Sequence, residues 1–156
     1  MPIRKDYGLP CPIARSLDIV GDRWTLLVVR DLLALGPRKY VELQASLSGI
    51  APNVLSERLK LLEEHGIVAR EFYEQHPPRA RYKLTRKGLG LRHVIYALLE
   101  WGNKYEYEAV SLVHDDCGHE VKLHHVCEKC GEDVRPSAVR RKFSKREAAV
   151  AAGQPL

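Results

Sequence analysis

Apolar residues recur every three or four positions through the first half of the chain, the spacing of helices that bury one face. Glycine and proline interrupt this pattern and mark where each helix ends. The run from Arg23 to Leu35 contains β-branched residues, but its length and the Gly36-Pro37 stop favour a buried helix over a strand. The predicted helices cover residues 12–20, 23–35, 41–47 and 52–65.

Two β-rich stretches follow, over residues 67–73 and 80–84, joined by a loop from Gln75 to Arg79. Thr85 then caps a longer helix with apolar residues along one side. A short extended piece at Lys39-Tyr40 precedes the helix over 41–47. This order of elements is that of a winged helix-turn-helix, so the predicted fold is mainly α with a small β-hairpin wing.

The helix over residues 52–65 has two different faces. Leu55, Leu59 and Leu62 are spaced by four and three positions and are expected to face the core. The opposite face carries polar side chains that can reach base edges in a major groove. These side chains are Asn53, Ser56, Glu57 and Lys60. The sequence therefore predicts a recognition helix.

The hairpin after this helix is the predicted wing, residues 74–81. Pro77-Pro78 stiffens its loop, and Arg79 and Arg81 are expected to contact phosphate or the minor groove. Arg38 and Lys39, near the start of the first extended piece, are expected to add phosphate contacts, the alternative being a solvated surface.

Two charged residues on the recognition helix have competing interpretations. Glu57 repels phosphate, so it either accepts a hydrogen bond from cytosine or stays solvated. Arg58 is off the centre of the face, and it either contacts phosphate or pairs with Glu63 or Glu42.

A metal-binding pattern occurs twice near the C-terminus. His114 and Cys117 are followed by Gly118, and Cys127 and Cys130 are followed by Gly131. Two ligands separated by two residues and followed by glycine form a tight turn that points both ligands at one ion. The four ligands complete a Cys₃His set for a tetrahedral, structural Zn²⁺ with no open position for a substrate.

The fourth metal ligand has competitors, because His119, His124 and His125 lie nearby. His114 is preferred because it occupies the position equivalent to Cys127, and His119 is the runner-up.

An enzyme is not expected. No histidine is followed two places on by the glutamate of zinc deaminases, and neither a glycine-rich phosphate loop nor a nucleophile motif is present.

The composition is that of an ordinary globular protein, and its positive net charge is compatible with a polyanionic partner. Hydrophobic content of 45% suffices for a core, and no apolar stretch approaches the ~20 residues of a membrane span. The opening residues lack the apolar segment of a signal peptide, which predicts a cytoplasmic protein. Net charge is +5, and the segment from Arg135 to Arg146 contains six basic residues, counting both ends, in a tail that either tracks phosphates or is disordered.

Residues 11 to 102 resemble the HxlR-type winged-helix transcriptional regulators. The matching segments are Cys11-Pro12, Leu17 to Leu27, Arg30 to Leu33, Arg38 to Leu43, Gly49 to Leu59, Leu62 to Val68, Tyr82 to Gly88 and Trp101-Gly102. Asp22 departs from the Gly or Lys of many relatives, and Tyr40 replaces the commoner Phe. The resemblance implies a bacterial, nucleoid-associated homodimer that binds a double-stranded DNA operator, with N- and C-terminal helices at the dimer contact.

The resemblance and the metal-binding pattern together suggest a division of the chain, and the resemblance also suggests a sensor. We expect a DNA-binding and dimerisation domain over 8–112, a zinc-knuckle module over 113–136 and a basic, disordered tail over 137–156. Cys11 falls where some relatives have a redox sensor, so a redox or small-molecule effector is one expectation, and an inert half-buried cysteine is the other. The alternative function is a zinc-ribbon protein-interaction module on a winged-helix scaffold without specific DNA binding.

Overall fold

The computed structural model describes residues 7–76, 78–140 and 142 of the chain. It divides into two compact units, with the division between Ile95 and Tyr96. The predicted tail over 137–156 lies mostly outside the described residues, as does Pro77 of the predicted wing.

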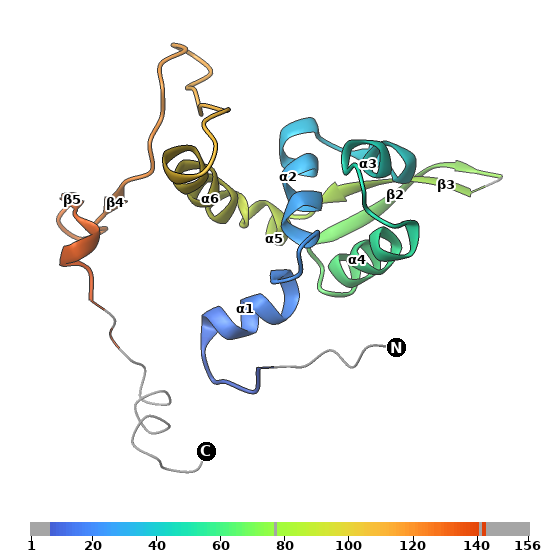
Figure 1. Ribbon diagram of the computed structural model, residues 1–156, viewed down its shortest axis with the longest axis horizontal. Coiled ribbons are helices and arrows are strands. Elements are labelled where there is room, and N and C mark those ends of the chain that lie inside the picture. Colours follow the sequence, from blue (N-terminus) through green and yellow to red (C-terminus); the bar gives the residue numbers. More distant parts are fainter. Residues whose placement is uncertain (1–6, 77, 141, 143–156) are drawn as a thin grey trace. The chain divides into compact units, whose positions relative to one another are not determined.

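Among its described residues, the first unit contains five helices, a three-stranded sheet and the start of a sixth helix (Figure 1). Its helices are α1 (Pro12–Val20), α2 (Thr25–Leu35), α3 (Tyr40–Ser46), α4 (Pro52–Glu64) and α5 (Arg86–Leu89), and α6 (Arg92–Tyr105) begins in it. Its strands are β1 (Arg38–Lys39), β2 (Val68–Gln75) and β3 (Pro78–Leu84). This order confirms the expected winged helix-turn-helix arrangement.

The sheet is antiparallel in the order β1-β3-β2. Arg38 lies opposite Tyr82, and Val68 lies opposite Leu84 at the base of the β2–β3 hairpin. In Figure 1 this hairpin extends beyond α3 and α4 as a two-stranded arm. The register shifts between Phe72 and Glu74, which marks a β-bulge or similar irregularity in the pairing.

One hydrophobic core holds these elements together. Leu55, Leu59 and Leu62 of α4 are at most 2% exposed, which confirms their predicted inward orientation. They pack in a cluster with Val28 of α2 and Leu43 of α3, among others. Because each fully buried leucine contributes about 1.5–3 kcal/mol, this cluster fixes the outward direction of the opposite face of α4.

Two predicted helix starts are wrong. The second helix begins at Thr25 rather than Arg23, with Trp24 as its N-cap residue. The Asp22 carboxylate accepts a hydrogen bond from the Trp24 N–H over 3.0 Å, just before the helix. The extended piece lies at Arg38–Lys39 rather than Lys39-Tyr40, since the Glu42 carboxylate accepts from the Lys39 N–H (2.7 Å) and starts α3 one residue early.

The single long helix predicted after Thr85 is also wrong, because the structure has two. The Thr85 hydroxyl caps α5 by accepting a hydrogen bond from the Gly88 N–H. Gly88 is buried against the backbone just before β2. A Cβ added to Gly88 would overlap the carbonyl oxygen of Ile67. The chain turns at Gly90, whose N–H donates to Lys87, and α6 starts two residues later.

The β2–β3 hairpin is longer than predicted. Pairing continues to Gln75 opposite Pro78, so residues 75, 78 and 79 of the expected loop belong to the strands. Glu74 lies opposite Arg79 near this end, and such an opposite-charge pair favours continued pairing.

The second unit begins within α6 and contains β4 (His125–Val126), β5 (Asp133–Val134) and a short 3₁₀ helix (Pro136–Ala138). The Asn103 side chain of α6 donates to the Val110 carbonyl and accepts from the Ala109 N–H. The Glu100 carboxylate accepts from the Leu123 N–H over 2.6 Å. In the described part of the chain, no helix is long and apolar enough to cross a membrane.

Candidate nucleic-acid interface

The turn between α3 and α4 determines how α4 is presented. Gly49 adopts a φ of +89°, which a residue with a side chain rarely adopts. The Ile50 N–H donates to the Leu47 carbonyl, and both side chains are buried. Pro52 then starts α4 at its first position, as the sequence predicts.

The outer face of α4 carries the polar residues expected of a recognition helix. Asn53, Ser56, Glu57 and Lys60 are all exposed, on the side opposite the buried leucine seam. The only interaction of the Lys60 ammonium within the described residues is a 3.8 Å ion pair with Glu64 in the next turn, and its side chain is 72% exposed. Asn53 and Ser56 can offer both hydrogen-bond donors and acceptors, the groups that base edges require.

Tyr40 is part of this surface, a role that the sequence did not indicate. Its hydroxyl donates to the Pro52 carbonyl over 2.7 Å and lies 3.3 Å from the Ser56 hydroxyl, which donates to it. Phenylalanine, which is the commoner residue at this position among HxlR-type regulators, lacks this hydroxyl. Tyr40 therefore ties the first turn of α4 to α3 and orients Ser56.

Arg58 is held by partners other than those suggested from the sequence. Its guanidinium lies 3.4 Å from the Asp22 carboxylate and 3.5 Å from that of Glu57, and its side chain is only 20% exposed. The suggested pairings with Glu63 and Glu42 are wrong, because Glu63 pairs with Arg70 and Glu42 caps α3. Arg58 thus joins α4 to the turn between α1 and α2 through Asp22, the residue that replaces the Gly or Lys of many relatives.

The basic residues of β1 lie beside the hairpin. The Lys39 ammonium lies 5.0 Å from the centre of the Tyr73 ring, a cation–π distance, while Lys39 itself is exposed. Arg38 is half-buried and lies opposite Tyr82 in the β1–β3 pair. Lys39 is therefore better placed than Arg38 to meet a phosphate.

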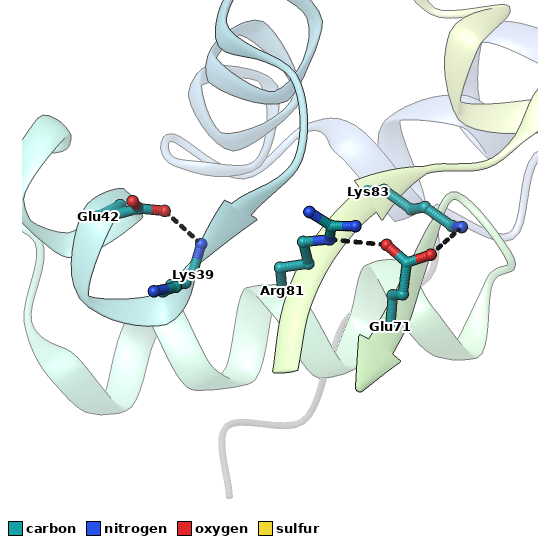
Figure 2. Close-up of polar contacts among 5 residues, drawn as sticks. All are labelled: Lys39, Glu42, Glu71, Arg81 and Lys83. Atoms are coloured by element: carbon teal, nitrogen blue, oxygen red, sulfur yellow. Dashed lines mark hydrogen bonds and ion pairs between the residues drawn. The ribbon is translucent and has the colours of Figure 1, made fainter. Parts of the chain in front are cut away.

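The wing arginines each face an acid on the neighbouring strand. Figure 2 shows Glu71 of β2 between Arg81 and Lys83 of β3, at 2.7 Å and 3.0 Å. Hydrogen bonds from Lys83 and Arg81 lower the pKa of Glu71 below its usual value, so its carboxylate is ionised at neutral pH. Arg79 lies 3.3 Å from Glu74. All these side chains are accessible, so pairing with the acids leaves the cations at the surface of the arm.

The predicted metal ligands lie in two separate pairs. His114 Nδ1 lies 3.1 Å from Cys117 Sγ, and the Cys127 sulfur interacts with the Cys130 side chain. Backbone N–H groups of Cys130 and Lys129, together with the Cys130 side chain, lower the pKa of the Cys127 thiol. Among the residues that the structure describes, no three His, Cys, Asp or Glu side chains surround a common point. Cys11 is half-buried at the N-cap position of α1.

Comparison with known proteins identifies the family. Residues 19–110 match the family described as HxlR-like helix-turn-helix. An uncharacterized HTH-type transcriptional regulator of Mycobacterium tuberculosis is 36% identical over 126 residues, 78% of each chain. The crystal structure of PA1607, a candidate transcription factor, is similar with a TM-score of 0.75 and 34% identity, covering 88% of this chain and 97% of that one. The redox regulator HypR in its oxidized form has a TM-score of 0.55 and 32% identity, covering 62% and 98%.

Proposed function

Since this chain belongs to the HxlR-like helix-turn-helix family, a family of DNA-binding transcriptional regulators, we propose that it recognises a specific operator by placing α4 in the major groove. The observation that carries this proposal is the two-sided construction of α4. Its leucine seam is buried, and its opposite face offers exposed Asn53, Ser56, Glu57 and Lys60. A helix that is anchored on one side and polar on the other can enter a groove without losing core contacts.

The surrounding cations supply contacts to the DNA backbone. Arg79 and Arg81 on the arm reach the phosphates or the minor groove beside the operator, and Lys39 meets a phosphate near the start of α3. Such contacts position the protein and supply salt-dependent affinity, whereas the α4 side chains select the sequence. Arg58 acts mainly by holding α4 against Asp22, because its guanidinium is already paired and largely buried.

We propose that the regulator acts as a homodimer. Four residues of α6 form an exposed apolar stripe at helical spacing: Val94, Leu98, Trp101 and Tyr105. On α1, Ile13 and Leu17 are likewise exposed. Large apolar side chains at such spacing favour burial against a second chain. Two copies related by a two-fold axis would read two half-sites about 34–36 Å apart, one turn of DNA, so the operator would be an inverted repeat.

The cellular setting and effector follow from the same assignment. As a DNA-binding regulator of bacterial type, the protein acts in the cytoplasm on nucleoid DNA and catalyses no reaction. The similarity to a redox regulator supports Cys11 as the residue through which oxidation changes operator binding. A disulfide to the partner subunit or a small-molecule adduct would form at the N-cap of α1, where the Cys11 thiol is half accessible.

Substitutions on the outer face of α4 test the recognition assignment. Asn53→Ala, Ser56→Ala and Lys60→Ala should weaken operator binding by ~1–3 kcal/mol wherever a base contact is lost, with unchanged thermal stability. Lys122→Ala removes an exposed lysine from the second unit and serves as the matched control for Lys60→Ala. Fluorescence anisotropy with a footprinted operator duplex gives the affinities. Wild-type affinity in all three α4 variants would refute the assignment.

A further inference from the structure

The two glycine-containing turns near the C-terminus have the same backbone hydrogen bonding. In the first, the Gly118 N–H donates to the His114 carbonyl over 2.7 Å, and in the second the Gly131 N–H donates to the Cys127 carbonyl over 2.8 Å. The two glycines have φ values of +69° and +71°, the left-handed conformation that glycine tolerates. The turns are therefore alike in conformation as well as in sequence.

The flanking chain repeats the same pattern. The His114 N–H donates to the His119 carbonyl (2.9 Å), and the Cys127 N–H donates to the Glu132 carbonyl (3.0 Å). Just outside these bonds, Val113 pairs with Glu120 and Val126 pairs with Asp133, both antiparallel. Each position of the first turn thus has its structural equivalent in the second, so the segment contains one structural unit twice.

This equivalence distinguishes among the candidate histidines. His114 corresponds to Cys127 and Cys117 to Cys130, whereas His119 corresponds to Glu132. The ring Nδ1 of His124 is already 2.9 Å from the Asp133 carboxylate. Of the four histidines near the cysteines, His114 alone occupies a position where the other turn places a cysteine.

The side chains in each turn are arranged as paired metal ligands. His114 directs Nδ1 toward the Cys117 sulfur, while its Nε2 lies 3.7 Å from the Asp116 carboxylate. A carboxylate on the far side of the ring is the arrangement that orients a metal-binding histidine. In the second turn, backbone N–H groups of Lys129 and Cys130 point at the Cys127 sulfur and can compensate the charge of a thiolate.

The segment has hydrogen bonds but no buried core to hold it together. From residue 106 to 140, a stretch described without gaps, every residue is exposed or half-buried, and Val113, Val121 and Val126 are all exposed. So short a segment without a core normally requires a metal, a disulfide or a partner. Each turn supplies two donors, and one tetrahedral ion needs four.

We propose that one Zn²⁺ per chain joins the two turns through His114 Nδ1 and the thiolates of Cys117, Cys127 and Cys130. All four positions of the ion are filled by protein, so the site is structural and holds no substrate. Binding couples to folding: the ion draws the turns together and orders residues 113–134. The site rests on the turns themselves and not on the DNA-binding assignment.

Metal analysis of the full chain, purified without chelator, tests the proposal first. We expect one Zn²⁺ per chain by elemental analysis, and replacement by Co²⁺ should give the intense visible bands of a tetrahedral site with thiolate-to-metal charge transfer. His114→Ala should lose most of its metal affinity and the tetrahedral spectrum, whereas the matched His119→Ala should keep both. Metal-free wild-type protein, or loss confined to His119→Ala, would overturn the site or its fourth ligand.

A variant that exchanges one ligand type for another keeps the test decisive even if His114→Ala misfolds. His114→Cys makes the first turn identical in ligand type to the second and should still bind one Co²⁺. Its thiolate-to-cobalt absorbance should rise by about one third, because four thiolates replace three. An unchanged absorbance would show that residue 114 does not contact the ion.

Discussion

Removing one wing arginine should reduce the salt dependence of operator binding by a defined amount. Arg79 and Arg81 are 60% and 48% exposed, and each pairs with an acid on β2. An exposed ion pair of this kind contributes at most about 1 kcal/mol, so a phosphate can take the place of the acid when DNA arrives. Each arginine that meets a phosphate then accounts for about 0.9 in the slope of log K against log salt.

The dimer doubles this magnitude, because each substitution occurs in both subunits. Arg81→Gln should therefore make the slope shallower by about 1.8, and so should Arg79→Gln. Over an about fourfold increase in salt concentration, each variant should lose about twelvefold less affinity than the wild type loses. An about twelvefold difference in affinity loss can be measured by binding titrations alone, without a structure of the complex.

Fluorescence anisotropy titrations at several salt concentrations give the slopes directly. Arg70→Gln is the control, since Arg70 lies near the start of β2, pairs with Glu63 and stacks on Tyr82 rather than reaching the tip of the arm. Its slope should equal that of the wild type. Wild-type slopes in both wing variants would refute the phosphate contacts, and a change of about half the expected size would contradict the dimer.

Further predictions concern the core, the α3–α4 contact and the candidate sensor. Leu59→Ala should lower the free energy of unfolding by ~2–5 kcal/mol in urea denaturation, because the side chain is fully packed; a loss under about 1 kcal/mol would contradict that packing. Tyr40→Phe should cost ~0.5–1.5 kcal/mol in the same assay by removing the bond to Pro52, and no cost would mean that the hydroxyl is dispensable. A mild thiol oxidant should change the operator affinity of the wild type but not of Cys11→Ser, and an equal response in both would exclude Cys11 as the sensor.

Local sequence signals were sufficient to predict the bounds of α1 and α4. The bounds of α1, and of α4 to within a residue, follow from proline at their first positions and glycine after their ends, signals that act through the backbone next to them. The inward seam of α4 follows equally from its spacing. These features required no knowledge of distant contacts.

Features that depend on distant contacts were missed or misassigned. The break between α5 and α6 arises where Gly88 packs against the Ile67 backbone, across 21 positions of the sequence, so helical periodicity alone could not reveal it. The pairing of Glu71 with Arg81 depends on the strand register, and that of Arg58 with Asp22 on the approach of α4 to the α1–α2 turn. Tyr40 gave no signal, because its hydroxyl acts only through the neighbouring helix.

Sequence-specific binding by α4 can be measured by comparing the affinities of the protein for two DNA duplexes. The affinity of the wild-type protein should be compared, at one physiological salt concentration, for the DNA upstream of its own gene and for a scrambled duplex of equal length. The protein should bind a footprinted inverted repeat in the upstream DNA at least about a thousandfold more tightly than the scrambled duplex. Equal, purely salt-dependent affinity for both duplexes would contradict it, and would mean that α4 reads no sequence and that the chain serves as an interaction module.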